Sequence, residues 1–269
     1  PKCAGVNVAN FGTLMTGNAF MNLDVKTPIE RIDGVLKTVE PIAVVTNAKF
    51  RPMVESVWNG AVIAIDEIVQ KPSGEIKYEE HWGFFGHKPI DTDPFCIINT
   101  SGSTGVPKSV VTPWRCFHNF VLWSIEEVGM RRDEEVSASV GPIFFDSWVQ
   151  DILLMAVNGL TQIQMPDSYR MFPVKMLQLM IEQKVTYFLW VPTIMTIIAN
   201  SGLVERFPIP TLRHCWYAGE VLPPHQVNIW MKANPQARYV NLYGPMEVSE
   251  VCTFYVLPGI MDKSKPIPI

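Results

Sequence analysis

A run of hydroxyl, glycine and lysine residues is the strongest chemical signal in this chain of 269 residues. It reads Thr100-Ser101-Gly102-Ser103-Thr104-Gly105-Val106-Pro107-Lys108. Glycines let backbone N–H groups approach an anion, the hydroxyls of Ser101, Ser103 and Thr104 add hydrogen-bond donors, and Lys108 supplies positive charge. An ordinary flexible turn can have a similar composition, but the packed hydroxyls and the Pro-Lys ending favour a loop that binds polyphosphate.

This loop differs from the P-loop of kinases and NTPases. The Walker A motif requires Gly-Lys-Ser/Thr after four intervening residues. In this chain Pro107 precedes Lys108, and the spacing from Gly102 or Gly105 does not fit. We therefore exclude a P-loop enzyme.

Short apolar segments alternate with helical patterns and must position the loop. Strands are predicted at 42–46, 61–65, 95–99, 185–190, 214–217 and 238–242, and helices at 27–39 and 173–183. The first helix is expected to have Thr27 as its N-cap and Pro28 as its first helical residue. Apolar strands alternating with amphipathic helices indicate the α/β class, with doubly wound parallel sheets that helices cover on both faces.

The charged run 131–135 is the best candidate for an internal boundary, and such runs are usually solvated loops. It separates two α/β subdomains of similar size. Residues 1–130 carry the glycine-rich loop, and residues 131–269 carry the remaining candidate site segments described below.

Composition narrows the classes of partner. Hydrophobic residues make up 48% of the chain and charged residues 18%, which is typical of a globular protein. A formal net charge of −4 gives no electrostatic footprint for nucleic acid or for an anionic membrane. The longest apolar stretch, 185–199, is too short to span a bilayer and is expected to be a buried strand running into a turn.

The cysteines indicate the cellular compartment, and the first residues indicate whether the native start is present. The five cysteines are scattered without CxxC spacing, so the sequence supports neither a zinc site nor a disulfide framework, and we expect a cytoplasmic protein. The chain begins at Pro1 without a signal pattern or an initiating Met, so we expect the native start to be missing.

The segment from Thr100 to Ser109 resembles the phosphate-loop signature of the adenylate-forming superfamily, with Ser109 where that family usually has Gly. The superfamily includes acyl-CoA synthetases, luciferases, adenylation domains of nonribosomal peptide synthetases and D-alanine carrier-protein ligases. Segment 14–24, with Pro28 and Arg31 after it, resembles a structural segment of the same family. Further matches follow in family order, up to Glu247.

Phe144-Phe145-Asp146-Ser147 resembles a segment of the amino-acid-activating members. The resemblance implies that an aromatic side chain packs beside the reacting carboxylate and that Asp146 pairs with the α-ammonium of the substrate. A charge-assisted bond of this kind contributes about 1.5–3 kcal/mol. The alternative role for Asp146 is that of a helix N-cap, with Ser147 beside it. The resemblance favours the ammonium anchor.

Two later segments resemble turns that bind the nucleotide in this family, Ala218-Gly219-Glu220 and Asn241-Leu242-Tyr243-Gly244-Pro245-Met246-Glu247. The second implies that Asn241 faces the adenine, that Tyr243 packs against it, and that Glu247 holds Mg²⁺, which prefers oxygen ligands. Met246 replaces the usual Thr, and the loss of one donor to the transition state costs about 2.7–4 kcal/mol if nothing compensates.

By the same resemblance, ten residues line the substrate pocket. They are Phe145, Asp146, Ser147, Gln150, Leu189, Trp216, Ala218, Leu242, Glu250 and Val251. Part of this set resembles pockets for proline, whereas Trp216 favours a small or compact side chain. Glu250 suits a basic substrate if it is buried, and is otherwise a surface helix residue. These indications leave the amino acid open.

The resemblance also implies the reaction. A substrate carboxylate attacks the α-phosphorus of ATP, pyrophosphate leaves, and the acyl group of the resulting acyl-AMP passes to the phosphopantetheine thiol of a carrier protein. Lys108 and Thr104 are expected to hold the phosphates, with the metal at Glu247. Catalysis of this kind is mostly positioning and charge neutralisation.

Two parts of the family's fold have no counterpart in this chain. In relatives, a stretch similar to Pro266–Ile269 leads into a β-barrel subdomain and a small C-terminal domain, which contribute a ribose-binding Asp and a catalytic Lys. We therefore expect this chain to be the large N-terminal part, to need the missing C-terminal subdomain as a partner, and to be inactive or weakly active alone.

Two other functions stay open. An acyl-CoA synthetase for acids without an amino group is disfavoured by Asp146. A degenerate adenylation fold that serves as a scaffold is favoured by Met246 and Ser109, but the phosphate loop and Glu247 argue against it.

Overall fold

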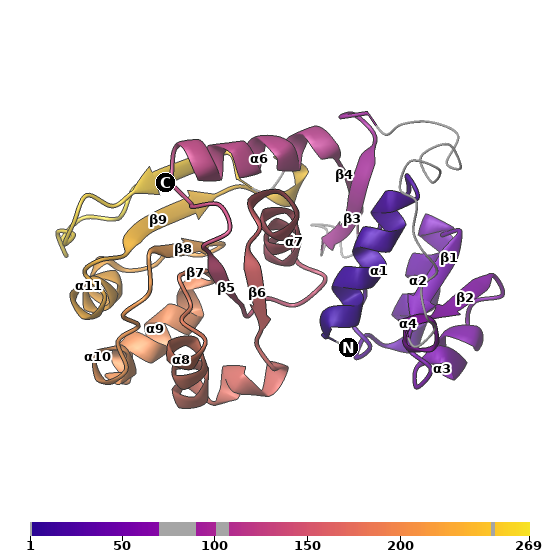
Figure 1. Cartoon of the computed structure of the whole chain (residues 1–269), viewed down its shortest axis with the longest axis horizontal. Helices are drawn as coiled ribbons and strands as arrows, with labels where there is room; N and C mark the ends of the chain where they lie inside the picture. Colours follow the sequence, from indigo (N-terminus) through magenta and orange to yellow (C-terminus); the bar gives the residue numbers. More distant parts are fainter. Residues whose placement is uncertain (1, 70–89, 101–107, 249–250) are drawn as a thin grey trace. The chain divides into compact units, whose positions relative to one another are not determined.

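The computed structural model describes residues 2–69, 90–100, 108–248 and 251–269. They form two compact units, 1–114 and 115–269 (Figure 1). Helix α6 (Trp114–Glu126) begins at this boundary and packs on the sheet of the second unit, where its Phe120 ring lies 6.2 Å from that of Trp216. The compact units therefore divide before α6 rather than at the charged run 131–135.

The first unit contains two short sheets with helices beside them. Its elements are α1 (Ala4–Met15), α2 (Ile29–Val39), β1 (Ala43–Thr46), α3 (Arg51–Glu55), β2 (Ala61–Ala64), α4 (Ile65–Val69), β3 (Pro94–Thr100) and β4 (Lys108–Pro113). Strands β1 and β2 pair in parallel, and β3 and β4 form an antiparallel pair. The expected N-cap at Thr27 is wrong, because Pro28 has a non-helical ψ of 141° and is itself the N-cap.

The segment 14–24 extends the β3–β4 pair. Phe20 forms a parallel bridge with Cys96, and its carbonyl accepts the backbone N–H of Ile97 at 2.9 Å. The rings of Phe20 and Trp114 meet Phe95 edge-on, with centroids 5.5 and 4.5 Å away. This segment is thus part of the framework that holds β3, in agreement with the structural role expected of it.

The second unit is a six-stranded sheet covered by helices on both faces. Its elements after α6 are β5 (Val136–Ser139), α7 (Asp146–Asn158), β6 (Thr161–Gln164), η1 (Asp167–Met171), α8 (Pro173–Glu182), β7 (Tyr187–Trp190), α9 (Pro192–Asn200), α10 (Leu203–Arg206), β8 (His214–Ala218), α11 (Pro224–Ala233), β9 (Arg238–Tyr243), η2 (Met246–Val248) and β10 (Thr253–Val256). The strand order is β10-β9-β8-β7-β5-β6, and β5 to β9 run parallel while β10 is antiparallel. The predicted α/β class is confirmed.

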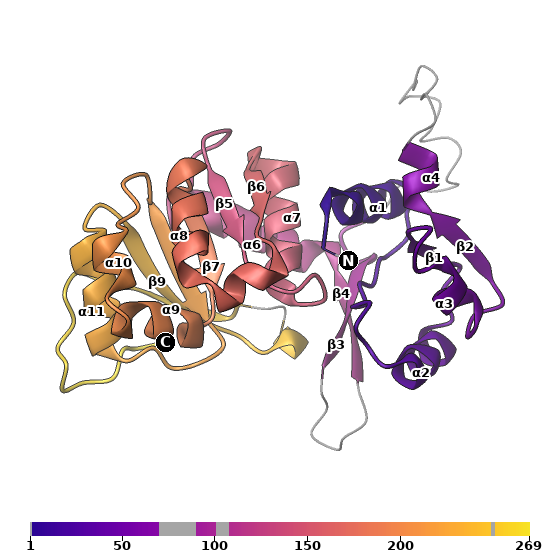
Figure 2. The same cartoon turned by 90° about the horizontal axis from the view of Figure 1, so that it is seen from below.

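The winding of this sheet changes direction once. From β5 the chain moves outward to the edge strand β6, then returns past β5 to β7 and continues to β8 and β9. Helices α6 and α7 cover one face, and α8 to α11 cover the other (Figures 1 and 2). This is the flavodoxin-like doubly wound order, in which the switch point lies between the first and third strands. Here the switch point lies between β5 and β7.

The core explains which segments became helices. Buried side chains of α8, α9 and α11, among them Met176, Met195 and Trp230, pack against Phe188 and Tyr217 of the sheet. The expected turn after strand 185–190 is wrong, because Pro192 occupies the first turn of α9, where a proline is tolerated. No helix among the described residues is long and apolar enough to cross a bilayer.

Candidate active site

The candidate residues of the second unit gather at one edge of its sheet. Parallel strands present their carboxyl ends at the same edge, and doubly wound sheets bind ligands outside those ends, at the switch point. The segment 145–147 follows β5, the segment 218–220 ends β8, and the segment 241–247 ends β9. Residues distant in the sequence are therefore brought to the edge where a ligand is expected.

Asp146 is the first residue of α7, beside the switch point. Phe145 is the N-cap, with an extended backbone at φ −99° and ψ 158°, and its side chain is 47% exposed. Oδ1 of Asp146 accepts the backbone N–H of Ser147 at 2.7 Å. Burial raises the pKa of Asp146 above its ordinary value, although hydrogen bonds from backbone N–H groups partly oppose the shift. Asp146 is thus a desolvated acid that an ammonium group would stabilise in its charged form.

Three of the nine described substrate-pocket residues are buried in the second unit. Gln150, Trp216 and Leu242 are 2%, 0% and 1% exposed, so their side chains are almost wholly covered. Leu189 faces Trp216 across β7 and β8, and Ala218 faces Leu242 across β8 and β9. The sheet register therefore places these four predicted residues in two neighbouring pairs. Glu250 lies outside the described residues.

Trp216 is held by aromatic side chains that the sequence analysis did not select. Its ring centroid lies 5.0 Å from Tyr187, 5.6 Å from Trp123 and 6.2 Å from Phe120. The two α6 residues also line a pocket of about 360 Å³, together with Cys116, Asn119, Val248, Val251, Cys252 and Phe254. Among the predicted substrate residues, Val251 borders this pocket. The sequence analysis predicted no helix at 114–126, and only the fold shows that α6 meets Trp216.

The turn after β8 depends on the backbone conformation of Gly219 and on hydrogen bonds to Glu220. Gly219 has a φ of +92°, a conformation that side chains with a Cβ rarely adopt, and a Cβ there would meet no atom within 4 Å. The carboxylate of Glu220 accepts hydrogen bonds from the backbone N–H of Thr193, at 3.0 Å, and from its hydroxyl. Glu220 thereby joins the turn to the first turn of α9, a structural role that the sequence did not predict.

The segment after β9 divides into a buried part and an exposed part. Asn241 is 5% exposed, and its Nδ2 donates to the carbonyl of Pro268 at 2.7 Å. Tyr243 is 49% exposed at the end of β9, followed by Gly244, which is half-buried. Met246 is buried in η2. The thioether that replaces the usual hydroxyl therefore packs into the protein.

Glu247 is an exposed acid on η2 at the carboxyl edge. The described residues contain no group of three or more His, Cys, Asp or Glu side chains that could hold a metal ion. A single carboxylate still fits Mg²⁺, because this ion usually takes one or two protein carboxylates and completes its shell with substrate phosphates and water.

Thr100 and Lys108 lie opposite each other at the end of the β3–β4 pair in the first unit. The hydroxyl of Thr100 is buried without a hydrogen-bond partner among the described residues, and Lys108 is exposed. A Walker A loop leads from a strand into a helix, whereas this loop joins two antiparallel strands, which supports excluding a P-loop. The Oγ of Ser109 donates to Oδ1 of Asn99 at 2.8 Å, so the serine in place of glycine is accommodated.

The remaining loop residues are not part of the structural description. Ser101, Gly102, Ser103, Thr104 and Gly105 lie outside the described residues. Their predicted contacts with phosphate stay predictions.

Comparison with known proteins covers almost the whole chain. The sequence profile of the family described as AMP-binding enzyme matches residues 1–268. The D-alanine–D-alanyl carrier protein ligase of Bacillus mycoides (strain KBAB4) is 24% identical over 97% of this chain and 51% of its own length. The L-proline–[L-prolyl-carrier protein] ligase of Streptomyces coelicolor is 27% identical over 100% of this chain and 52% of its own length. The chain thus spans about half the length of these relatives.

Solved structures share the fold. The Vibrio cholerae adenylation domain AlmE, in complex with glycyl-adenosine-5'-phosphate, has a TM-score of 0.79 at 18% identity and covers 94% of this chain and 50% of its own. The nonribosomal peptide synthetase FmoA3 has a TM-score of 0.83 at 22% identity, with 98% of this chain and 27% of its own covered. At these identities the likeness concerns the fold alone.

Proposed function

Because the chain belongs to the AMP-binding enzyme family, we propose that the protein carrying it activates an amino acid with ATP, as the aminoacyl-AMP, for transfer to the phosphopantetheine thiol of a carrier protein. The observation that supports this most directly is Asp146, a desolvated acid at the carboxyl edge of a doubly wound sheet, beside the switch point. Such a position suits the binding of a small ligand with an ammonium group.

The reaction forms one bond and breaks another at phosphorus. A carboxylate oxygen of the amino acid attacks the α-phosphorus, the bond to the β-phosphate oxygen breaks, and pyrophosphate leaves. Asp146 holds the ammonium group and Phe145 packs beside the carboxylate. Asn241, Tyr243 and Gly244 receive the nucleoside, with Gly219 and Glu220 forming the neighbouring turn. These groups act by fixing the reactants in place.

Charge on the phosphates must be neutralised by other residues. Lys108 supplies a positive charge, and the loop residues 100–105 supply hydroxyl and backbone donors. Mg²⁺, held at Glu247, would offset negative charge on the phosphate oxygens. The family and the names of the two relatives, each a ligase that joins an amino acid to a carrier protein, support this assignment.

Pyrophosphate exchange tests the proposal on the full-length protein. We expect one or a few of the twenty amino acids to support ATP–pyrophosphate exchange. The variant Asp146→Asn should raise the KM for that amino acid by about 10- to 150-fold, the size of a charge-assisted hydrogen bond, with the KM for ATP unchanged. Asp167→Asn, an exposed acid on η1 of the same unit, is the matched control.

Two results would contradict the proposal. Exchange with acetate or benzoate but with no amino acid would indicate an acyl-CoA synthetase type of ligase. No exchange, together with no ATP binding by calorimetry, would indicate a scaffold. Loading of the amino acid onto a carrier protein that bears phosphopantetheine tests the second step.

A further inference from the structure

The pocket between α6 and β10 carries two thiol groups. It has a volume of about 360 Å³, and its walls come from α6 and from the segment of η2 and β10. The α6 wall includes Cys116, Phe120 and Trp123, which are spaced as neighbours on one face of a helix. Cys252, the residue before β10, belongs to the second wall. The fold thus brings two cysteines that are distant in the sequence to one pocket.

Both thiols are held by regular elements. The ring of Trp123 meets that of Phe254 on β10 edge-on, with centroids 4.8 Å apart, so this face of α6 is directed at β10. Cys116 lies two turns before Trp123 on the same face. The backbone N–H of Cys252 donates to the carbonyl of Tyr243 at 2.9 Å, and its Sγ donates to the same carbonyl at 3.5 Å. Cys252 is therefore fixed against the end of β9.

Exposure separates these two cysteines from the others. All five cysteines of the chain lie among the described residues, and none of them forms a disulfide. Cys252 is exposed and Cys116 is half-buried, so a small solute in the pocket reaches both. Cys96 and Cys215 are 0% exposed, and Cys3 lies in the first unit. Cys116 and Cys252 are thus the two accessible thiols of the second unit.

An exposed thiol with a second thiol across a pocket can be oxidised reversibly by a peroxide. The Cys252 sulfur attacks one oxygen of hydrogen peroxide, the O–O bond breaks, and the leaving hydroxide takes the thiol proton and departs as water. The Cys116 sulfur then attacks the sulfenic sulfur, the S–O bond breaks, and a second water leaves with the Cys116 proton. Two thiols become one disulfide, and a dithiol reductant reverses the step by thiol–disulfide exchange.

We propose that Cys116 and Cys252 form a redox-sensitive pair, in which a disulfide across the pocket ties α6 to β10 and switches off amino-acid activation. A disulfide brings the two Cβ atoms to about 3.5–4.5 Å, so the pocket narrows when the bond forms. The second wall includes Val248 and Val251 and directly follows Glu247, the candidate metal residue. The loss of activity rests on the proposed function, whereas formation of the disulfide does not.

The test treats the reduced full-length protein with hydrogen peroxide. Peptide mapping by mass spectrometry should find a disulfide between Cys116 and Cys252, and dithiothreitol should remove it. Pyrophosphate exchange should fall by about 10-fold or more on oxidation, because the wall beside the site is displaced, and should recover after reduction. Cys252→Ser and Cys116→Ser should each show the same exchange before and after peroxide. Cys3→Ser, which removes an exposed thiol of the first unit, is the matched control and should respond as the wild type does.

Three results would overturn the inference. Sulfinic acids at the two cysteines, without a peptide that joins them, would show that the thiols do not meet. A disulfide that leaves pyrophosphate exchange unchanged would refute the switch. A loss of exchange that persists in Cys252→Ser would place the sensitive group elsewhere.

The readouts stay informative if a variant or the proposed function fails. If Cys252→Ser does not fold by circular dichroism, Cys252→Ala takes its place, and the peptide map of the wild type depends on no variant. Failure of the proposed function is distinguishable, because the reduced wild type would then show no exchange that depends on an amino acid, while the peptide map would still report the disulfide.

Discussion

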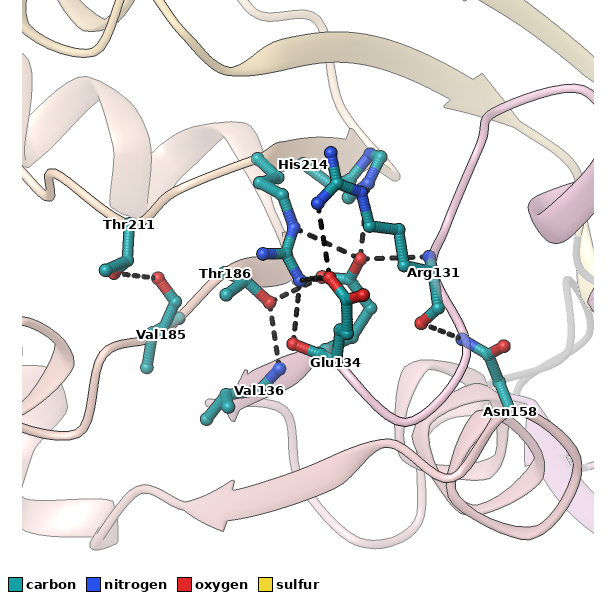
Figure 3. A network of polar contacts seen from close by, with 10 residues as sticks. Arg131, Glu134, Val136, Asn158, Val185, Thr186, Thr211 and His214 are labelled. Carbon is teal, nitrogen blue, oxygen red and sulfur yellow. Dashed lines mark hydrogen bonds and ion pairs between the residues drawn. The ribbon is translucent and has the colours of Figure 1, made fainter.

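Nη2 of Arg213 lies 3.1 Å from Oε2 of Glu135, and this ion pair joins the residue before β8 to the residue before β5. The Glu135 side chain is fully buried and also accepts hydrogen bonds from the backbone N–H of Arg131, at 3.0 Å, and from the hydroxyl of Thr186. Arg131, Thr186 and His214 lie close together in this network of polar contacts (Figure 3). The expectation of a solvated charge run at 131–135 is therefore wrong for Glu135. This residue holds the starts of three strands together, at the edge of the sheet opposite the candidate site.

We predict that Glu135→Ala lowers the free energy of unfolding by about 3–5 kcal/mol, because removal of one partner leaves the charge of Arg213 without its buried partner. Chemical denaturation followed by circular dichroism measures this change. Glu134→Ala is the matched control, since its side chain is 54% exposed and its ion pairs lie at the surface. The control should lose less than about 1 kcal/mol. Equal losses in the two variants would contradict the role of Glu135.

His214 makes the stability of the second unit depend on pH. Burial is the main cause that lowers its pKa from 6.5 to about 4. The positive charges of Arg213, Arg238 and Arg131 also lower the pKa, and the negative charge of Glu135 partly opposes the shift. As the pH falls from 6.5 towards 4, the unfolded chain takes up a proton that the folded chain does not. The free energy of unfolding should therefore decrease across this range.

The variant His214→Phe isolates this contribution. Its free energy of unfolding should decrease less than that of the wild type between pH 6.5 and pH 4, because the titrating group is absent. Parallel pH profiles for the two proteins would show that His214 does not contribute. The change in the free energy of unfolding must be compared between the two proteins, because carboxyl groups elsewhere in the chain also titrate in this range.

Trp216 is predicted to limit the size of the substrate side chain. Trp216→Ala removes a fully buried indole from its contacts with Tyr187, Trp123 and Phe120, and should lower the free energy of unfolding by about 3–5 kcal/mol. The cavity should also let larger amino acids support pyrophosphate exchange. Phe172→Ala, whose side chain is 52% exposed, is the control for loss of an aromatic ring. An unchanged order of preference among amino acids in Trp216→Ala would refute the role in selectivity.

Asn228 anchors the C-terminal segment of the described chain. Its Nδ2 donates to the carbonyl of Met261 at 2.8 Å, and its Oδ1 accepts the N–H of Met261 at 2.7 Å. Asn228→Ala should lower the melting temperature and expose the segment after β10 to proteolysis, because two partly buried hydrogen bonds are lost, at about 1 kcal/mol each. Asn200→Ala, an exposed residue that accepts one hydrogen bond from Gln226, is the control. A segment as resistant to protease as in the wild type would contradict this anchoring role.

The sequence alone determined the fold class, six of the strands and the helices α2 and α8. Continuous apolar runs and helical periodicity depend on local residue order, so β7, β9 and α8 were found within a few residues of their ends. Ordered motifs likewise identified the segments at the ends of β5, β8 and β9, because the identity and spacing of their residues are visible in the chain.

Only the tertiary structure decided which residues meet across the sheet. Burial of Glu135 depends on Arg213 and Thr186, which are distant in the sequence, and the packing of Phe120 and Trp123 on Trp216 depends on where α6 lies on the sheet. Desolvation and pairing are properties of spatial surroundings, and a linear pattern does not encode them residue by residue.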